Sequence, residues 1–401
     1  MIDIWPALPL SIWCTRIGSV DNIIAVLERS DRVCRITLWE VKSLDLEIVL
    51  AAMQQPFPEL TRLWLANYSE TVPVVPDSFL GGSAPCLQRL VLHRISFPGL
   101  PKLLLSATHL VRLRLDDIPH SGYISPEEMV TALSTLTSLY LFSLRFQSPR
   151  SCPDQTSRRL PPSTRSVLPI LSYFRFKGVA EYLEDLVARV DAPRLNHLEI
   201  GLINDITFDI PQVMQFISRT PMSRALERAR IELRIFDARL YFLSQTSGDE
   251  KVDVHILCRQ LDWQLSSLEQ VCTSCLPLLS ILEDLYIYDD HPYDSPDWKD
   301  EIENGLWLQL LHPFTAVKNL YLSEQIALRI GPALQELAEG RMTEVLPALQ
   351  NIFLRGLEPS GPVQEGIGKF VAARQVTSRP IAVSSWAISD RDKDYDWDWD
   401  V

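Results

Sequence analysis

Two stretches of the chain carry the same pattern of apolar and polar positions. The first, LQRLVLHRI, begins at Leu87 and the second, LVRLRLDDI, begins at Leu110, so L-x-x-L-x-L-x-x-I recurs after 23 residues. Alternation of leucine with other residues is typical of a strand that buries one of its faces. The intervening FPGLPKLLLSAT has the apolar content of a short helix. The pattern therefore predicts a strand, a helical return and the next strand.

The strand pattern recurs along most of the chain. Further copies begin at Val33, Leu60, Leu136, Leu171, Leu195, Leu282, Val317 and Leu349. Two degraded copies, RIELRIF from Arg230 and KVDVHIL from Lys251, lack the leading leucine. About a dozen strands in one phase predict an α/β fold, namely a leucine-rich-repeat solenoid. In such a solenoid a curved parallel sheet is joined by helical or irregular returns, and the repeat length here is irregular.

Several spacers between the strands contain helix signals. In SPEEMVTALSTL, Ser125 is a potential N-cap, Pro126 would be the first helical residue and Glu128 would complete a capping box. A second helix is predicted in GVAEYLEDLVARV, where one face would hold Tyr182, Leu183, Leu186 and Val190. Two more helices are expected, one at ELAEG and one over residues 362–374.

The pattern divides the chain into three parts. Residues 1–32 form a capping segment whose helix carries apolar residues at positions 23, 24 and 27, and a cap of this kind seals the first repeat. Residues 33–380 form the solenoid, and residues 381–401 form a terminal strand followed by an acidic, aromatic tail. Within the solenoid, residues 147–167 are rich in Pro, Ser and Arg, which predicts a mobile loop. That loop is either a phosphorylation or docking segment or a tolerated surface insertion.

The tail has a distinctive alternation of residue types. From Asp390 to Asp400 it holds six aspartates against Arg391 and Lys393, and the aspartates alternate with aromatic residues at 395, 397 and 399. Acidic and aromatic alternation occurs in short docking motifs, and it also suits a disordered, solubilising end.

The overall charge restricts the class of partner. A formal net charge of −13 argues against non-specific binding of nucleic acid or of an anionic membrane. No apolar run reaches the roughly 18 residues of a membrane span, and no secretory signal precedes the repeats. The seven scattered cysteines therefore predict reduced thiols in a cytoplasmic or nuclear protein. In that setting the sequon at Asn67 would not be glycosylated.

The sequence contains no motif that points to catalysis or to a cofactor. Walker A, Rossmann, G-x-S-x-G and H-E-x-x-H patterns are all missing, so we predict a protein that is not an enzyme. Cys272 and Cys275 form a C-x-x-C in an apolar helical context, which favours two buried core thiols over a zinc or redox site. The acidic group formed by Asp289, Asp290, His291 and Asp294 could hold a cation, but its prolines favour a turn. No cofactor and no metal are predicted.

Residues between the leucines should form columns on the concave face, because equivalent positions of neighbouring strands stack about 4.8 Å apart. One column carries arginine in four consecutive repeats, at positions 35, 62, 89 and 112. In the repeat that starts at Leu136, the same alignment places Ser138, Tyr140 and Phe142 outward. Together the columns define the predicted protein-binding residues: Arg35, Arg62, Trp64, Arg89, His93, Arg112, Arg114, Tyr140, Phe142, Tyr173, Tyr286, Tyr288, Tyr321 and Phe353.

Two interpretations of the arginine column fit the residue types. Like charges across a ladder repel, so an acidic or phosphorylated segment of a protein partner could bind there, and arginine with aromatic residues is typical of binding hot spots. Alternatively, solvated arginine stems cover the leucine layer while their charges point into water.

Taken together, several stretches resemble the fungal family of F-box proteins with C-terminal leucine-rich repeats. The carrying stretches are SVDNIIAVLERSDRVCRI, FPGLPKLLLSATHLVRLRLDDIPHSGYISPEEMVTAL, QFISRTP, LDWQLSSLEQVC, LLHPFTAVKNLYLS and VLPALQNIFLRGL. The resemblance implies a substrate receptor of a Skp1–cullin–F-box ubiquitin ligase. It departs from the family pattern before the first repeat, because WPALPLSIW lacks the L-P-x-E-I start of an F-box. Skp1 and cullin are therefore partners only if an F-box is supplied.

The leading functional hypothesis is thus a protein-interaction module of the receptor type that lacks its F-box. The alternative is a stand-alone leucine-rich-repeat scaffold or sensor with no ligase association. Both would bind protein through the concave face.

Overall fold

The computed structural model describes eleven segments of the chain: residues 8–15, 20–148, 165–203, 210–224, 226–244, 251–258, 260–275, 279–289, 303–338, 344–355 and 362–386. They divide into two compact units. The first unit holds the elements from β1 to η5, and the second holds those from β11 to β17. Strand β13 is divided between them, with Asp253 and the residues after it in the second unit.

The first unit alternates strands with helices along the chain. Its strands are β1 (Leu10–Cys14), β2 (Val33–Val41), β3 (Arg62–Asn67), β4 (Arg89–His93), β5 (Arg112–Ile118), β6 (Leu141–Phe146), β7 (Ser166–Val167), β8 (Tyr173–Gly178), β9 (Val190–Asp191) and β10 (His197–Ile203). Its α-helices are α1 (Val20–Leu27), α2 (Ser43–Ala52), α3 (Leu100–Ser106), α4 (Pro126–Leu133), α5 (Ala180–Val187) and α6 (Pro211–Ser218). Its described residues also form the 3₁₀ turns η2 (Phe79–Gly82), η3 (His120–Gly122) and η5 (Pro221–Arg224).

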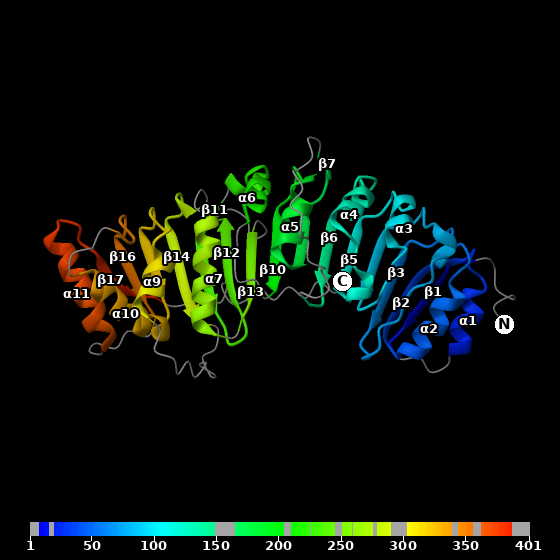
Figure 1. The fold of residues 1–401 in the computed structure, drawn as a ribbon, viewed down its shortest axis with the longest axis horizontal. Helices are drawn as coiled ribbons and strands as arrows, with labels where there is room; N and C mark the ends of the chain where they lie inside the picture. Colours follow the sequence, from blue (N-terminus) through cyan, green and yellow to red (C-terminus); the bar gives the residue numbers. More distant parts are fainter. Residues whose placement is uncertain are drawn as a thin grey trace. The chain divides into compact units, whose positions relative to one another are not determined.

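All the long strands of this unit run parallel. Their order is β1-β2-β3-β4-β5-β6-β8-β10, so each strand pairs with the one from the preceding repeat, while β7 and β9 form a separate parallel pair. The helices lie in a row over one face of the sheet (Figure 1). We call the opposite face of each unit's sheet its outward face. This arrangement confirms the predicted strand, return, strand repeat.

The leucines of the repeat form the core, as the alternation predicts. In β3, β4 and β5 the paired residues Leu63, Leu90 and Leu113 are at most 1% exposed. Burying one such side chain contributes about 1.5–3 kcal/mol relative to leaving it in water. Because each layer buries its leucines against the next, the core is continuous along the unit.

The first predicted helix start is confirmed. Ser125 is the N-cap of α4, its hydroxyl accepts from the Glu128 backbone N–H at 3.3 Å, and Glu128 Oε2 accepts from the Ser125 backbone N–H at 3.2 Å. Helix α5 buries Tyr182, Leu183 and Leu186 as predicted. Val190, predicted on the same helix face, instead lies in β9, because the helix ends at Val187.

The second unit contains the remaining strands and helices. Its strands are β11 (Leu226–Leu233), β12 (Ala238–Ser244), β13 (Lys251–Leu257), β14 (Asp284–Asp289), β15 (Asn319–Leu322), β16 (Asn351–Leu354) and β17 (Ala382–Ser385). Its helices are α7 (Leu261–Ser274), α9 (Asn304–Leu311), α10 (Glu324–Leu337) and α11 (Pro362–Val376). The strand order is β13-β12-β11-β14-β15-β16-β17. Each neighbouring pair from β11 through β14, β15 and β16 to β17 is parallel.

One hairpin in this unit was not predicted. Strand β12 is antiparallel to β11, and a turn closed by the Arg234 N–H donating to the Asp237 carbonyl at 2.9 Å joins them. The degraded copy predicted from Arg230 is therefore wrong in register, since RIELRIF runs out of β11 into this turn. The leading leucine of that repeat is Leu226, and the alanine at 229 in place of a second leucine hides the pattern.

The register predicted for the repeat at Leu136 is wrong by three residues. LTSLYLFSL has leucines at 136, 139, 141 and 144, so the pattern fits more than one alignment. In the structure the Leu139 N–H donates to the Leu136 carbonyl in the turn before the strand, just as Leu87 donates to Ala84. The repeat therefore begins at Leu139, and Phe142 pairs with the buried Leu113.

The ends of the predicted domains fall only partly within the described residues. The capping segment contributes β1, which pairs in parallel with β2, and α1, which buries Ile23 and Leu27. Most of the loop predicted at 147–167 lies outside the described residues, and its last two residues form β7. The terminal strand is β17, and residues 387–401 of the tail lie outside the described residues.

Candidate protein-binding surface

The outward face of the first unit carries an unbroken row of arginines. Arg35 pairs with Arg62, Arg62 with Arg89 and Arg89 with Arg112 in the registers of β2 to β5. We call these four residues the arginine ladder. Among the described residues, no carboxylate lies within ion-pair distance of Arg35, Arg62 or Arg89. The predicted column is thus formed as the alignment requires.

The pKa of Arg89, near the centre of the ladder, reflects both partial burial and repulsion by the neighbouring arginines. Desolvation, followed by the positive charges of Arg112, Arg62 and Arg35, lowers the pKa of Arg89. An arginine guanidinium nevertheless stays protonated at neutral pH. The ladder is therefore a line of like charges held about 4.8 Å apart by the strand spacing, and an anion bound along it would reduce their repulsion.

A group of rings lies beside the ladder on the same face. Trp39 stacks on Trp64 with ring centroids 5.6 Å apart and on Tyr68 at 6.4 Å, and Tyr68 contacts His93 at 5.0 Å. We call Trp39, Trp64, Tyr68 and His93 the aromatic cluster. Tyr68 is 51% exposed, so the cluster offers ring surface to a ligand. Trp64 follows Arg62 by two residues in β3, which places cations and rings next to each other.

The surroundings of His93 favour its neutral form. Burial lowers its pKa, and Arg145 and Arg114 add to that effect, while Asp117 and Asp116 oppose it. A neutral imidazole next to Tyr68 extends the stacking surface without adding charge.

Two other arginines of this face, Arg114 and Arg175, are neutralised by carboxylates. Arg114 donates from Nε and Nη2 to Asp116 Oδ2 at 3.2 and 3.0 Å, and Arg175 pairs with Glu199 at 2.7 Å. Arg114, which the sequence analysis grouped with the ladder, therefore forms an internal ion pair. The strongest positive potential of this face is expected over Arg35, Arg62 and Arg89.

The corrected register changes the part played by three predicted residues. Phe142 is 1% exposed and stacks on Phe174 at 5.3 Å inside the core, so its predicted outward position is wrong. Tyr140 precedes β6 and is 37% exposed, and its ring lies 5.2 Å from that of Tyr173. Leu141 occupies the position beside Arg112 that the alignment gave to Ser138.

The remaining predicted residues lie in the second unit, and three of them, Tyr286, Tyr321 and Phe353, form a separate row. Tyr286 stacks on Tyr321 at 4.1 Å and Tyr321 stacks on Phe353 at 4.5 Å. Trp386 packs edge-on against Tyr286 at 6.0 Å and Tyr321 at 5.7 Å, and its Nε1 donates to the Leu322 carbonyl at 3.2 Å. The row is therefore partly covered by the chain itself, and burial raises the pKa of Tyr286.

Tyr288 is a structural residue rather than a surface one. It is 5% exposed, and its hydroxyl donates to Glu232 Oε1 at 2.7 Å. Glu232 also pairs with Arg230 at 2.9 Å and with Arg234 at 3.0 Å. Tyr288 shares the outward face with Tyr286, but Glu232 and Arg230 of β11 cover it, so the predicted exposure of Tyr288 is wrong.

The hairpin carries a second polar network. Asp237 accepts from Arg239 Nε at 3.1 Å and is hydrogen-bonded to His255 Nε2. Burial by itself would raise the pKa of Asp237, but the hydrogen bonds and charges of His255 and Arg239 lower it. The network pairs the carboxylate of Asp237, at the start of the second hairpin strand, with side chains of β12 and β13.

Other candidate sites found in the sequence have internal roles. Cys272 and Cys275 are at most 2% exposed at the end of α7, as predicted for core thiols. Asn67 is fully buried, accepts from the Ser69 N–H at 3.0 Å and donates to the Thr71 carbonyl at 2.7 Å, so its sequon is part of the fold. Of the predicted acidic group only Asp289 is described, and the described residues include no metal-binding cluster.

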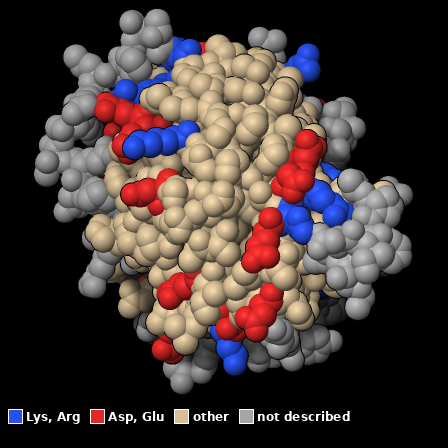
Figure 2. Space-filling view, turned by 90° about the vertical axis from the view of Figure 1, so that its right-hand side faces the viewer, with Lys and Arg blue, Asp and Glu red and all other residues tan. Residues whose placement is uncertain are grey.

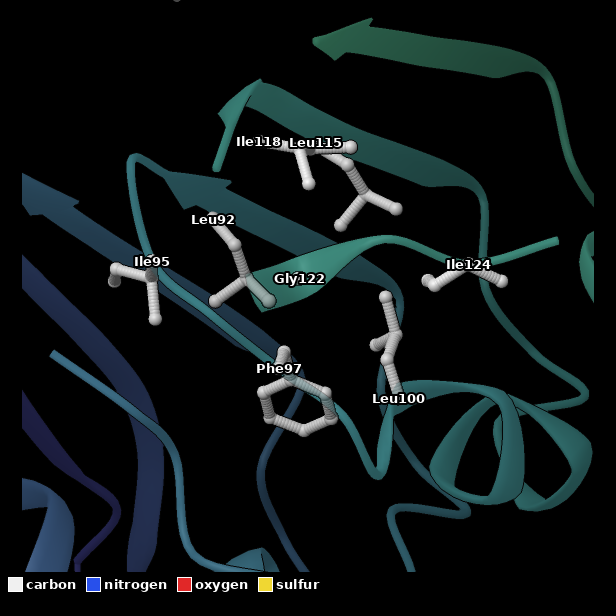
Figure 3. A pocket seen from close by; sticks show the side chains of 8 residues that line it. All are labelled: Leu92, Ile95, Phe97, Leu100, Leu115, Ile118, Gly122 and Ile124. Carbon is white, nitrogen blue, oxygen red and sulfur yellow. The ribbon is translucent and has the colours of Figure 1, made fainter. Parts of the chain in front are cut away.

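The cavities lined by described residues on the sheet offer no obvious ligand site. A small cavity behind β4 and β5 is lined by Leu92, Ile95, Phe97, Leu100, Leu115, Ile118, Gly122 and Ile124 (Figure 3). These side chains supply no polar group that could orient a ligand. A groove of about 260 Å³ lies on the helix side of the second unit, between α7 and α9.

Another surface, at one end of the first unit, has a broad area without charged side chains. Figure 2 views the end of the first unit formed by β1, α1 and α2, where acidic side chains gather beside a broad area without charge. Trp13 of β1 is 76% exposed, and Leu44 and Ile48 of α2 are also exposed. Strand β1 is the edge of the sheet in this unit.

Parallel strands from successive repeats, with buried leucines at the alternate positions and helices on one side, establish the architecture. The fold is that of a leucine-rich-repeat protein. No family model matches the chain, and no curated protein matches it. Among solved structures, the chain is similar to the crystal structure of the leucine-rich repeat-containing protein LegL7 from Legionella pneumophila, at 12% sequence identity and a TM-score of 0.31. That match covers 90% of this chain and 97% of the other.

Three residues of the leucine-rich-repeat surface were missed by the site prediction. Trp39 and Tyr68 belong to the aromatic cluster, and Arg145 lies on the outward face of β6 beside Lys177. Trp39 was visible in a predicted column, whereas Tyr68 follows β3 and joins the cluster only through the fold. Arg145 was hidden by the register error at Leu136. Among the described residues, no helix is long and apolar enough to cross a lipid bilayer.

Proposed function

We propose that this chain is a non-catalytic protein-interaction module whose first unit binds an acidic or phosphorylated segment of a partner protein. The observation that carries the proposal is the ladder, in which Arg35, Arg62 and Arg89 are aligned without a carboxylate among the described residues. Guanidinium groups bind carboxylates and phosphates through paired hydrogen bonds. A binding surface would explain why Arg35, Arg62 and Arg89 have no carboxylate partner among the described residues, whereas Arg114 has one.

The aromatic cluster supports the same assignment. Arginine with tryptophan and tyrosine is the composition of binding hot spots, because these side chains combine large contact area with directed hydrogen bonds. The rings of Trp64 and Tyr68 lie beside the charges of the ladder. A ligand with both acidic and apolar side chains would use both.

The alternative is that the ladder only covers the leucine layer. In that case the methylene stems of the arginines protect Leu63 and Leu90 while their charges stay hydrated. The two interpretations predict different effects of reversing the charge of a ladder residue. A binding site would lose its affinity for an anionic ligand, whereas a cover over the leucines needs only the methylene stems.

The test is the binding of a fluorescent phosphoserine peptide to the full chain, measured by anisotropy. The proposal expects the double variant R62E/R89E to bind at least tenfold more weakly, a loss of about 1.4 kcal/mol. R194E, which reverses an exposed arginine outside the ladder, should bind as the unmodified chain does. Circular dichroism of each variant confirms folding. Equal affinity of R62E/R89E and R194E would overturn the proposal.

A second pair of variants tests the rings. Trp64→Ala should lower the affinity for the phosphoserine peptide, because a stacking surface beside the ladder is lost. Trp263→Ala removes a tryptophan that is 54% exposed on α7, so it serves as the matched control. Equal effects of the two substitutions would remove the aromatic cluster from the proposed site.

Within this function we propose the finer role of a ubiquitin-ligase substrate receptor in the cytoplasm or nucleus. Its support is the resemblance of the stretches quoted above to fungal F-box repeat proteins. Because Skp1 and cullin are partners only if an F-box is supplied, the test joins an F-box ahead of the chain and assays ubiquitin transfer to a protein that carries the bound phosphoserine peptide. Transfer that is lost in R62E/R89E supports the receptor role, while peptide binding without transfer supports the stand-alone scaffold.

A further inference from the structure

Two strands of the described sheet, β1 and β17, have a neighbouring strand on one side only. Strand β1 pairs with β2, and β17 pairs with β16. Proteins usually protect such edges with charged residues or proline, because the unpaired N–H and C=O groups of an edge can pair with another chain. Neither strand has that protection, since β1 reads LSIWC and β17 reads AVSS. Each edge can therefore accept a further strand.

Exposed apolar side chains lie at both edges. Trp13 of β1 is 76% exposed, and at the other edge Val376, at the end of α11, is 87% exposed. Val383 of β17 pairs in register with the fully buried Ile352, yet it is itself 43% exposed. A repeat buries its inward side chains only against the next repeat, and no described layer follows β17. The apolar layer is therefore incomplete at this edge.

The free peptide groups of the two edges are complementary. The N–H of Ala382 donates toward β16 at 2.9 Å, and the N–H of Leu10 donates toward β2 at 2.7 Å. Because peptide groups alternate in direction along a strand, the groups of the next residues, Val383 in β17 and Ser11 in β1, point away from the sheet. A parallel pairing of Ala382 with Ser11 would join these free groups in the hydrogen-bond pattern of the existing sheet.

The same pairing keeps the two faces of the sheet in phase. It places Val383 beside Ile12, and both belong to inward columns, since their partners in β16 and β2 are buried isoleucines. On the outward face it places Ser384 beside Trp13, and the small serine leaves room for the indole. The inward layer would then continue from one edge into the other.

The two edges also differ in charge. Residues 366–386 include Lys369, Arg374 and Arg379 but no carboxylate, and Lys369 and Arg379 are exposed. Residues 20–32, which form α1 and the turn before β2, hold three acidic residues against two arginines. Figure 2 shows acidic side chains gathered at this end of the first unit. The charges therefore favour contact between the unlike edges over contact between two β17 edges.

We propose that the chain associates head to tail, with β17 of one copy pairing in parallel with β1 of a second copy. The two edges belong to different copies, so the contact does not depend on how the two units of one chain are arranged. Because the edges are unlike, each added copy presents a new free edge, and association continues beyond a dimer unless a ring closes. This inference goes beyond the proposed function, since the contact uses neither the ladder nor the aromatic cluster.

The experiment measures the mass of the full chain by sedimentation velocity over a range of protein concentrations. The unmodified chain should form species larger than a dimer as its concentration rises. Trp13→Glu places a carboxylate at the β1 edge, and Val383→Glu places one at the β17 edge. Each variant by itself should associate at least tenfold more weakly, because every contact between identical copies would include one altered edge.

A mixture of the two variants distinguishes head-to-tail contact from a two-fold dimer. W13E keeps its β17 edge and V383E keeps its β1 edge, so an equimolar mixture should form a dimer and nothing larger. A mixture that stays monomeric would overturn the proposal. A dimer of V383E alone would do so too, because it would show that two β1 edges pair with each other.

Matched controls separate the edges from a general effect of added charge. Leu105→Glu on α3 and Trp263→Glu on α7 alter side chains that are 45% and 54% exposed away from both edges, and they should associate as the unmodified chain does. Ser11→Pro and Ser385→Pro form a second pair of edge variants, which remove a free N–H without adding charge. Circular dichroism confirms that each variant is folded. An unmodified chain that is monomeric at every concentration overturns the inference, whatever the phosphoserine peptide does.

Discussion

The hydroxyl of Ser143 donates a hydrogen bond to Asp116 Oδ1 across 2.9 Å, and both side chains are buried. The two residues lie on adjacent strands, and the other carboxylate oxygen of Asp116 pairs with Arg114. This contact ties the register of β6 to β5. It also separates Arg114 from the ladder, because the buried carboxylate neutralises its charge.

Changing Asp116 to asparagine should therefore have two opposite effects. The amide keeps an acceptor for Ser143 but no longer neutralises Arg114, so the affinity for an acidic peptide should rise severalfold. Stability should fall by about 1–3 kcal/mol, because a charge-assisted hydrogen bond is lost. Ser143→Ala is the control, since it should lower the urea midpoint without raising peptide affinity. An unchanged affinity in D116N would show that Arg114 is not near the bound peptide.

The pair formed by Asp237 and His255 predicts a dependence on acidic pH. Because the folded pKa of Asp237 is lowered below the unfolded value of about 3.9, its contribution is fully present above pH 4 and is lost as pH falls through the folded pKa. Asp237→Asn should lower stability at pH 7 by about 3–5 kcal/mol, because it leaves partners of a buried ion pair uncompensated. The substitution should also make the free energy of unfolding fall less steeply as pH decreases below 4.

Urea unfolding of this variant at pH 7, 4 and 3 gives the measurement. Asp77→Asn, at an exposed carboxylate, should change the midpoint by no more than about 0.5 kcal/mol at pH 7. If the two variants lose stability equally, the hairpin network does not stabilise the second unit.

The two buried thiols predict a dependence on alkaline pH. Burial raises the pKa of Cys275 to about 12 and that of Cys272 well above its ordinary value, so both stay protonated in the folded chain. In the unfolded chain they ionise above about pH 8.5. The unfolded state then binds fewer protons, so stability should fall as pH rises beyond that point.

The double variant C272A/C275A isolates this effect from that of the buried tyrosines. It should be less stable than the unmodified chain at pH 7.5, yet it should lose less stability between pH 8.5 and 10. In the folded chain a thiol reagent should label the exposed Cys86 well before Cys272 or Cys275, which peptide mass spectrometry would reveal. Early labelling of Cys272 would contradict its burial.

The contact between α10 and α11 depends on a missing side chain. A Cβ atom at Gly366 would lie 2.9 Å from the backbone carbon and oxygen of Gly331, and neither helix backbone can move easily. Gly366→Ala should therefore cost about 1–3 kcal/mol through overpacking. Gly368→Ala, two residues on in the same helix, meets nothing within 4 Å and should stabilise by about 0.5–1 kcal/mol. Thermal unfolding of both variants tests the sign of each stability change. A G366A variant as stable as the unmodified chain would contradict the close approach of Gly366 to Gly331.

The repeats could be predicted because their signal is local. Leu63, Leu90 and Leu113 alternate with arginines at fixed positions, and strand geometry alone sends the two sets to opposite faces. The ladder follows from that alternation once neighbouring strands are paired in phase. The capping box at Ser125 is equally local, since its two hydrogen bonds join residues three apart.

The sequence predictions were wrong where the local pattern fitted more than one register, or where residues distant in the chain determined pairing or burial. Leu136 and Leu139 both satisfy the repeat, and only pairing with β5 selects Leu139. Tyr288 alternates like an outward residue but is buried by Glu232, which is 56 positions away in the chain. Strand β12 has no leucine pattern, and its place is set by pairing with β11.

By itself, therefore, the sequence determined the class of fold, the inward leucines and the arginine column, since these depend on side-chain alternation along single strands. Only the tertiary structure decided which charges are neutralised, which rings meet and which are covered. Ser143 reaches Asp116, and Tyr68 reaches Trp39, through the pairing and turns of separate repeats. The physical reason is that ion pairing, stacking and desolvation act over a few ångströms in space, and one strand alone does not set those distances.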